Sequence, residues 1–348
     1  MPPSHLTPAP NRPPGGAYLP RTRLRWPSRT AFLGLATLSG LLAGCRPAPP
    51  PPAPTPGVRI PFATSNGTQA LAQVTVLCDL GPRDAGTPGG ERAARWIANE
   101  LRQAGLPARL DSFTNQTPSG PLICHNVLAE IPAATPEPSL AGRRRPALPV
   151  IVLLSHFDTK SGIAPDFIGA NDGGSSTGLL LELARLLQRT PLRHCRVLCG
   201  FVDGEECRIQ FGPHDGLHGS RRLASQLADS RQAVRAVILL DMIGDRDLTV
   251  TLPANGTPQL TLLALEAAKQ VGARDQFRLA DTNILDDHQP FLDAGFPAVD
   301  LIDFVYGSAP GLHDYWHTAQ DTVDKLSATS LTTMGQVVAE MLGRLDTP

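Results

Sequence analysis

The chain has 348 residues, of which 41% are hydrophobic and 18% charged, and its formal net charge is -1 at pH 7. This length allows one large or two ordinary domains, and the hydrophobic fraction is sufficient for a sizeable core. The near-zero net charge excludes a broadly basic surface of the kind that binds nucleic acid.

Residues 1–45 predict a lipoprotein signal peptide rather than part of the fold. Four arginines between residues 21 and 29 precede an apolar run, residues 31–43, which is too short for a transmembrane helix. The run ends in Leu42-Ala43-Gly44-Cys45, which resembles the lipobox of bacterial lipoproteins, where cleavage before the cysteine leaves it to carry lipid. The alternative is a chance cysteine after an ordinary signal peptide. We expect an envelope protein, lipid-anchored through Cys45 and facing the periplasm or the cell exterior.

Residues 46–63 predict a tether, because proline and alanine dominate its first part and favour an extended chain. Residues 64–348 then predict a single catalytic domain. Among the five further cysteines, Cys195 and Cys199 lie at about 13 Å from one another if a strand joins them. That separation is too long for a disulfide, so we expect buried thiols, with one disulfide possible among the other cysteines.

Predicted helices and strands alternate from residue 64 onward. Apolar residues at three- and four-residue spacing predict helices at 90–104, 177–188, 260–271 and 330–345. Short apolar or alternating runs predict strands at 108–113, 126–131, 149–155, 196–202, 236–241 and 298–302. Such alternation is typical of a three-layer α/β/α sandwich with a mostly parallel central mixed sheet.

Polar residues gather at the ends of these strands and in two loops. They are His156, Asp172, Glu205, Glu206, Asp241 and His317. Each has an ordinary explanation on its own, such as a solvated acidic turn for Glu205 and Glu206 or a helix cap for Asp172. In an open α/β sheet, however, the carboxyl ends of strands line the ligand crevice, and their joint placement there favours a shared site. Two carboxylates and one histidine would hold a zinc ion with one position open.

These motifs resemble the zinc-dependent aminopeptidase superfamily and, more closely, its glutaminyl-peptide cyclotransferases of the animal type. The stretches that carry the resemblance include Ser155-His156-Phe157-Asp158, Gly169-Ala170-Asn171-Asp172, Asp203-Gly204-Glu205-Glu206, Leu239-Leu240-Asp241, Asp286-Asp287-His288-Gln289-Pro290-Phe291-Leu292 and Trp316-His317-Thr318. The resemblance runs from about residue 64 to residue 345. It implies an enzyme that converts the N-terminal glutamine of peptides or proteins to pyroglutamate with release of ammonia.

The resemblance also implies roles for individual residues. Asp172, Glu206 and His317 would hold one zinc ion per chain. Glu205 would shuttle the proton, and Asp241 would hydrogen-bond to Glu205 and help to handle that proton.

Further positions concern the substrate. Asp286 would bind the reacting amide nitrogen, Trp316 would form a wall of the pocket, and Phe211 stands where the family has a tryptophan. Two other departures are Leu285 in place of a glutamine and Ser155 in place of a cysteine, so the family's disulfide is missing. These departures affect the substrate pocket rather than the metal ligands.

Two alternatives remain. A zinc aminopeptidase of the same fold would use two metal ions and a water nucleophile, with His156 and Asp241 holding the second ion. The Asp286-Asp287-His288 run and Trp316 favour the cyclotransferase instead. A non-catalytic surface lipoprotein that binds peptides or metal would show no turnover, but it leaves Glu205 beside a complete ligand set unexplained.

Overall fold

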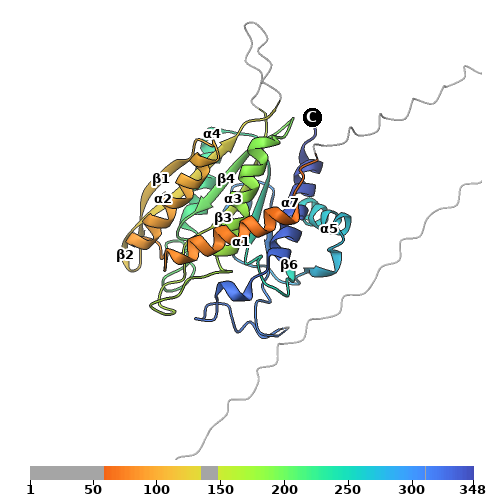
Figure 1. Cartoon of the computed structure of the whole chain (residues 1–348). Coiled ribbons are helices and arrows are strands. Elements are labelled where there is room, and N and C mark those ends of the chain that lie inside the picture. Colours follow the sequence, from red (N-terminus) through yellow and green to blue (C-terminus); the bar gives the residue numbers. More distant parts are fainter. Residues whose placement is uncertain (1–58, 135–147, 310) are drawn as a thin grey trace, which may run out of the picture. The chain divides into compact units, whose positions relative to one another are not determined.

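The computed structural model describes residues 59–134, 148–309 and 311–348. The predicted signal peptide, Cys45 and the tether up to residue 58 lie outside the described residues. The described part confirms the predicted α/β/α architecture, with helices on both faces of one mixed sheet (Figure 1). No helix within these residues combines the length and the apolar character that crossing a membrane requires.

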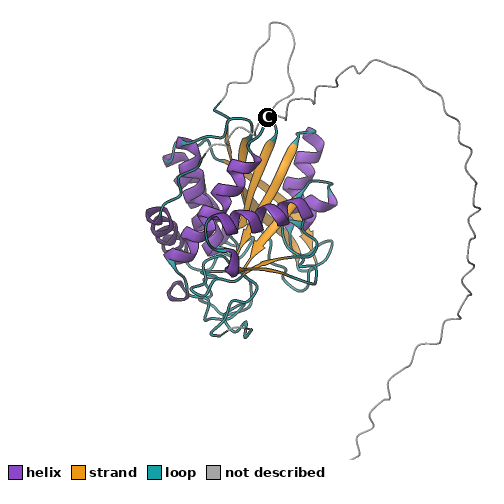
Figure 2. Ribbon diagram, turned by 90° about the vertical axis from the view of Figure 1, so that its right-hand side faces the viewer, coloured by secondary structure: helices purple, strands orange, loops and turns teal. Residues whose placement is uncertain are grey.

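The described residues form a sheet of eight strands in the order β1-β2-β4-β3-β5-β8-β6-β7. Figure 2 shows the strands in orange with helices on either side of them. The strands are β1 (Arg109–Thr117), β2 (Gly120–Ile131), β3 (Val150–His156), β4 (Arg196–Val202), β5 (Val234–Asp241), β6 (Val250–Leu252), β7 (Phe277–Leu279) and β8 (Ala298–Ile302). The four central strands β4, β3, β5 and β8 run parallel to one another. Antiparallel pairs flank them, β2 with β4 on one side and β6 with β8 on the other.

Within the described ranges, seven helices cover the two faces of this sheet. They are α1 (Thr64–Asp79), α2 (Pro88–Gln103), α3 (Gly174–Arg189), α4 (His218–Ser230), α5 (Pro258–Gln270), α6 (Gln289–Asp293) and α7 (Ala328–Leu345), with short 3₁₀ turns at Arg274–Gln276 and Val323–Lys325. Helices α1, α2, α3, α5 and α7 share the larger apolar cluster on one face. Helices α4 and α6 pack on the other face.

Strand β3 shows why the sequence forms a two-sided sheet. Its side chains alternate between faces, so Ile151 and Leu153 enter the larger cluster while Val152 and Leu154 enter the smaller one. All four are fully buried. A strand covered on both faces must be apolar at every position, and this is the continuous run that the sequence contains.

The predicted strands and helices all exist, and β4 and β8 have the predicted bounds. Strand β2 begins earlier than predicted, because it continues as the hairpin partner of β1, and its added residues include the exposed Pro121 and Ile123. Helices α1, α4 and α6 and strands β6 and β7 were not predicted. The cysteines Cys78, Cys124, Cys195, Cys199 and Cys207 are free and buried. The sequence left open one disulfide among these five cysteines, and the structure has none between them.

Candidate active site

A cavity of about 530 Å³ opens where the central strands end. Its lining includes Asp172, Glu205, Glu206, Phe211, Asp241, Asp286, Trp316 and His317. The structure therefore brings together all but one of the site residues predicted from the sequence. The remaining one, His156, is the last residue of β3 and lies below the cavity floor with 1% of its surface exposed.

The two neighbouring glutamates are held by the turn that follows β4. Gly204 has φ of 74°, and a Cβ atom there would lie 3.0 Å from the Cys124 sulfur, so the turn requires glycine. The Asp158 carboxylate accepts hydrogen bonds from the backbone N–H groups of Glu205 and Glu206, at 3.1 and 3.2 Å. Asp158 thus fixes the backbone of both glutamates at once and directs their side chains into the cavity.

The first candidate metal site consists of Asp172, Glu206 and His317. The His317 Nε2 atom lies 3.0 Å from Glu206 Oε1 and 3.2 Å from Asp172 Oδ2. The Asp172 Oδ2 atom is buried and, apart from this contact with the His317 ring, has no hydrogen-bond partner, which is the state expected of an atom that faces a cation. His317 adopts a left-handed backbone with φ of 52°, a strained conformation that is typical of functional positions. Two carboxylates and one imidazole fit a zinc ion with an open position.

A second candidate group shares Asp172 with the first. The His156 Nε2 atom lies 3.2 Å from Asp172 Oδ1 and 3.2 Å from Asp241 Oδ1. The close approach depends on Gly173, because a Cβ atom there would lie 2.9 Å from the imidazole ring of His156. Asp172 can therefore offer one oxygen to each group, and the arrangement has the donors for one or for two metal ions.

The structure places Asp241 beside His156 rather than against Glu205. In the described residues the Glu205 carboxylate makes no hydrogen bond, and Asp241 contacts His156 instead. Burial, together with the charge of Glu206, raises the pKa of Glu205 well above its ordinary value. A buried carboxyl group without a hydrogen-bond partner and with a raised pKa is suited to exchange a proton with a bound substrate.

The pKa values of two proposed metal ligands, Asp172 and His317, shift in opposite directions. Burial alone would raise the pKa of Asp172, but contacts with His156 and His317 lower it. Burial opposes the charged form of His317, yet Asp172 and Glu206 raise its pKa to about 10. A proton on His317 therefore takes the place that a cation would fill, and metal binding must displace that proton.

Asp286 lies across the cavity at 3% exposure. Its Oδ1 atom accepts the backbone N–H of Asp287 at 2.5 Å, whereas Oδ2 is buried and has no partner. Burial and the neighbouring Asp241 and Asp287 raise the pKa of Asp286 well above its usual range. A protonated or partly protonated carboxyl group at this position can face an uncharged amide of a substrate.

Aromatic rings form one wall of the cavity. Trp316 stacks on His317, with ring centroids 4.2 Å apart and planes inclined by 23°. Phe304 packs against Trp316 at 5.3 Å, and Phe211 lies elsewhere on the lining. The stack limits the rotation of the His317 ring, so Trp316 contributes to metal-site geometry as well as to the pocket wall.

Two residues that support the site were not predicted from the sequence. The Asp321 carboxylate accepts the backbone N–H groups of Asn171 and Asp172, at 2.7 and 3.1 Å. The fully buried Arg83 guanidinium donates to the carbonyl oxygens of Phe157, Ile168 and Gly169. Asp321 follows the Trp316-His317-Thr318 run by three residues, but that run does not indicate a supporting role for it, and Arg83 lies in none of the motif stretches.

Comparison with known proteins identifies the family. The model of peptidase family M28 matches residues 126–342. The chain belongs to peptidase family M28. Its relatives include cyclotransferases: the glutaminyl-peptide cyclotransferase-like protein of Bos taurus is 30% identical over 294 residues, which cover 75% of this chain and 71% of the relative. The glutaminyl-peptide cyclotransferase of Drosophila melanogaster is 27% identical over 74% of this chain and 75% of its own length.

A solved structure extends this M28 relationship to three dimensions. The glutaminyl cyclase of an Acidobacteriales bacterium superposes with a TM-score of 0.73 at 33% identity, covering 86% of this chain and 99% of that protein. The relationship that the motifs predicted is therefore confirmed: the chain is a member of the glutaminyl cyclase group of the zinc aminopeptidase-like superfamily.

Proposed function

We propose that this M28 protein is a zinc-dependent glutaminyl-peptide cyclotransferase, which converts N-terminal glutamine of peptides or proteins to pyroglutamate and releases ammonia. The observation that carries the proposal is the position of Glu205. Its buried carboxyl group lines the same cavity as the proposed metal ligands Asp172, Glu206 and His317. The proposal also agrees with the names of the chain's relatives, a glutaminyl-peptide cyclotransferase-like protein and a glutaminyl cyclase.

The chemistry requires the substrate's α-amine to attack the carbon of its own γ-amide. Zinc, when bound by Asp172, Glu206 and His317, supplies the positive charge that polarises the amide oxygen. Glu205 accepts a proton from the attacking amine and returns it to the leaving amide nitrogen. The new C–N bond closes a five-membered lactam, the old C–N bond breaks, and ammonia leaves.

The remaining residues position the substrate and exclude water. Asp286 lines the cavity and is the carboxyl group proposed to contact the amide –NH₂ group. The rings of Trp316 and Phe304 present an apolar wall, which lowers the local dielectric and favours ring closure over hydrolysis.

The group of His156, Asp172 and Asp241 is the observation that favours a second candidate, an aminopeptidase with two metal ions. It has less support, because the matches at 30% and 33% identity are a glutaminyl-peptide cyclotransferase-like protein and a glutaminyl cyclase, whereas a leucine aminopeptidase precursor matches at 24%. One assay separates the two functions. We expect ammonia from Gln-peptides, no free amino acid from aminoacyl substrates, and about one zinc ion per chain. Release of amino acids with two zinc ions per chain would support the aminopeptidase.

We also propose that the protein is anchored in the bacterial envelope by lipid on Cys45, which supports action on exported peptides. The lipobox-like sequence before Cys45 is its support. In the bacterial source cells, Cys45→Ser should prevent lipid attachment and leave the protein in the soluble fraction or unprocessed. Normal processing and membrane fractionation of that variant would contradict the anchor.

A further inference from the structure

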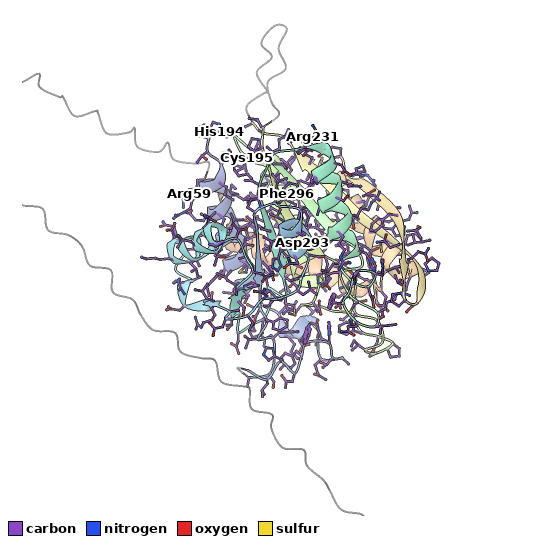
Figure 3. All side chains as sticks on the ribbon, turned by 180° about the vertical axis from the view of Figure 1, so that it is seen from behind. Arg59, His194, Cys195, Arg231, Asp293 and Phe296 are labelled. Carbon is purple, nitrogen blue, oxygen red and sulfur yellow. The ribbon has the colours of Figure 1, made fainter. Side chains whose placement is uncertain are left out.

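A second groove, of about 580 Å³, lies next to the active-site cavity, between α4 and α6. Figure 3 shows Asp293, at the end of α6, beside α4. Arg221 and Ala224 line the groove from α4, and Gln289, Asp293 and Ala294 line it from α6 and the residue that follows it.

Leu285 is the one residue that lines both the groove and the cavity. It immediately precedes Asp286, and 49% of its surface is exposed, so it forms an apolar ridge between the two spaces. A large exposed leucine beside a catalytic cavity needs an apolar partner if it is to contribute to binding.

The surroundings of Leu285 define the chemistry of that partner. On the cavity side its neighbours include the uncharged Ile284 and Val305, whereas the floor carries several carboxylates. An acidic side chain close to those carboxylates would be repelled. On the groove side, Arg221 donates to the Pro213 carbonyl oxygen at 2.7 Å and Asp293 accepts from Gln289 at 2.7 Å, and because the two charges are opposite in sign they favour neither a basic nor an acidic side chain. An apolar side chain therefore fits the ridge best.

A groove on the other side of α4 provides a comparison. It has about 510 Å³ and lies between β1 and α4, with Asn115, His218 and Asp229 in its lining. None of its lining residues borders the active-site cavity. Of the two grooves, only the one beside α6 is continuous with the site where the N-terminal glutamine would react.

We infer that the substrate peptide leaves the cavity over Leu285 and continues along the α4–α6 groove, so that an apolar residue after the N-terminal glutamine packs on Leu285. This peptide track depends on the cyclotransferase function proposed above and names its preferred substrates. They are peptides that begin with glutamine and a leucine-like residue and extend for several residues beyond it.

The ridge is tested with the amidated dipeptides Gln-Gly, Gln-Leu and Gln-Glu, which carry no C-terminal charge. We expect the wild-type kcat/KM for Gln-Leu to exceed that for Gln-Gly by about fivefold, as partial burial of one leucine side chain implies. Gln-Glu should be the poorest of the three. In Leu285→Glu the ratio of Gln-Leu to Gln-Gly should fall to about one. Leu279→Glu, at a leucine with 59% exposure that lines neither space, should keep the wild-type ratio.

The groove is tested by the gain from a longer substrate. Wild type should convert amidated Gln-Leu-Ala-Ala-Ala with a lower KM than amidated Gln-Leu. Ala294→Trp, which fills the α4–α6 groove, should abolish that gain, whereas Asp229→Trp in the other groove should retain it.

The ratios compare substrates within one variant, so a general loss of catalysis cancels. An unchanged Gln-Leu to Gln-Gly ratio in Leu285→Glu, or an unchanged length effect in Ala294→Trp, would overturn the peptide track while the cyclotransferase function stands. A wild-type protein that releases no ammonia from any of these peptides would overturn the function itself.

Discussion

The body of β3 and the end of the same strand are equally buried but differ in chemistry. Leu153 and Leu154 pack in the two apolar clusters, whereas His156 is surrounded by carboxylates. At that end of the sheet, several buried polar atoms, Asp286 Oδ2 among them, have no hydrogen-bond partner. Burial in the body stabilises the fold, but each unpaired polar atom at the end costs about 1–3 kcal/mol. The strand end is therefore built for binding and chemistry at the expense of stability.

The largest effect should come from the strand end and should appear in the reaction rate. Glu205→Gln keeps size and polarity but cannot carry a proton, so it should slow cyclisation by about 10²–10⁴-fold while retaining zinc and fold. Glu206→Gln should lose zinc as well as activity, because Glu206 is a proposed ligand. Zinc content and ammonia release are measured for both variants. Normal cyclisation by Glu205→Gln would contradict the separate roles of the two glutamates. So would a loss of zinc from Glu205→Gln while Glu206→Gln keeps its zinc.

A change in the body should show the opposite pattern. Leu153→Ala opens a cavity among fully buried side chains and should lower the free energy of unfolding by about 2–5 kcal/mol. The folded protein should keep its zinc and its kcat. Leu262→Ala, at a residue with 57% exposure, is the control and should change stability by less than about 0.5 kcal/mol. Denaturant titration measures both. If Leu153→Ala instead lost zinc at unchanged stability, the separation of body and strand end would fail.

Zinc should offset part of the instability of the strand end. At a free zinc concentration of about 100 times the dissociation constant, binding should add about 2.7 kcal/mol to the free energy of unfolding. Chelation should remove this increment in wild type and have no effect on His317→Ala. Thermal unfolding with and without chelator provides the comparison. An equal response of the two proteins would exclude His317 as a ligand.

A smaller effect should appear in the pH dependence of stability. Burial raises the pKa of Asp303, just after β8, to about 7. Between about pH 4 and pH 7 the folded state keeps this proton and the unfolded state does not, so stability falls as pH rises, by at most about 1.4 kcal/mol per pH unit for this group. Asp303→Asn should reduce that slope, and Asp229→Asn, at an exposed aspartate, should not. Identical slopes in wild type and Asp303→Asn would contradict the raised pKa.

The same contrast explains which parts of the structure the sequence predicts. The buried strands β4 and β8 were predicted with their observed bounds, because a continuous apolar run has few other interpretations. Helix α4 was missed, since only Leu223, Ala224 and Leu227 bury apolar surface along a helix otherwise rich in polar residues.

The candidate site divides in a similar way. Glu205, Glu206 and Asp241 directly follow or end predicted strands, so their convergence follows from parallel topology. Arg83 and Asp321 act through backbone atoms of distant loops, at separations of 74 or more residues along the chain. Such contacts form only when the chain has folded, and no local pattern of residues predicts them.

The free cysteines give the protein an internal set of reporters for local opening. Burial raises the pKa of the Cys195 thiol, before β4, to about 11, and that of Cys199 within β4 to about 12. At neutral pH these thiols are protonated and shielded, so a thiol-specific reagent can label them only during a transient opening of the structure. In a Cys45→Ser protein, the order in which the five buried thiols react would map the stability of the fold from the catalytic end of the sheet to the opposite end, without any engineered probe.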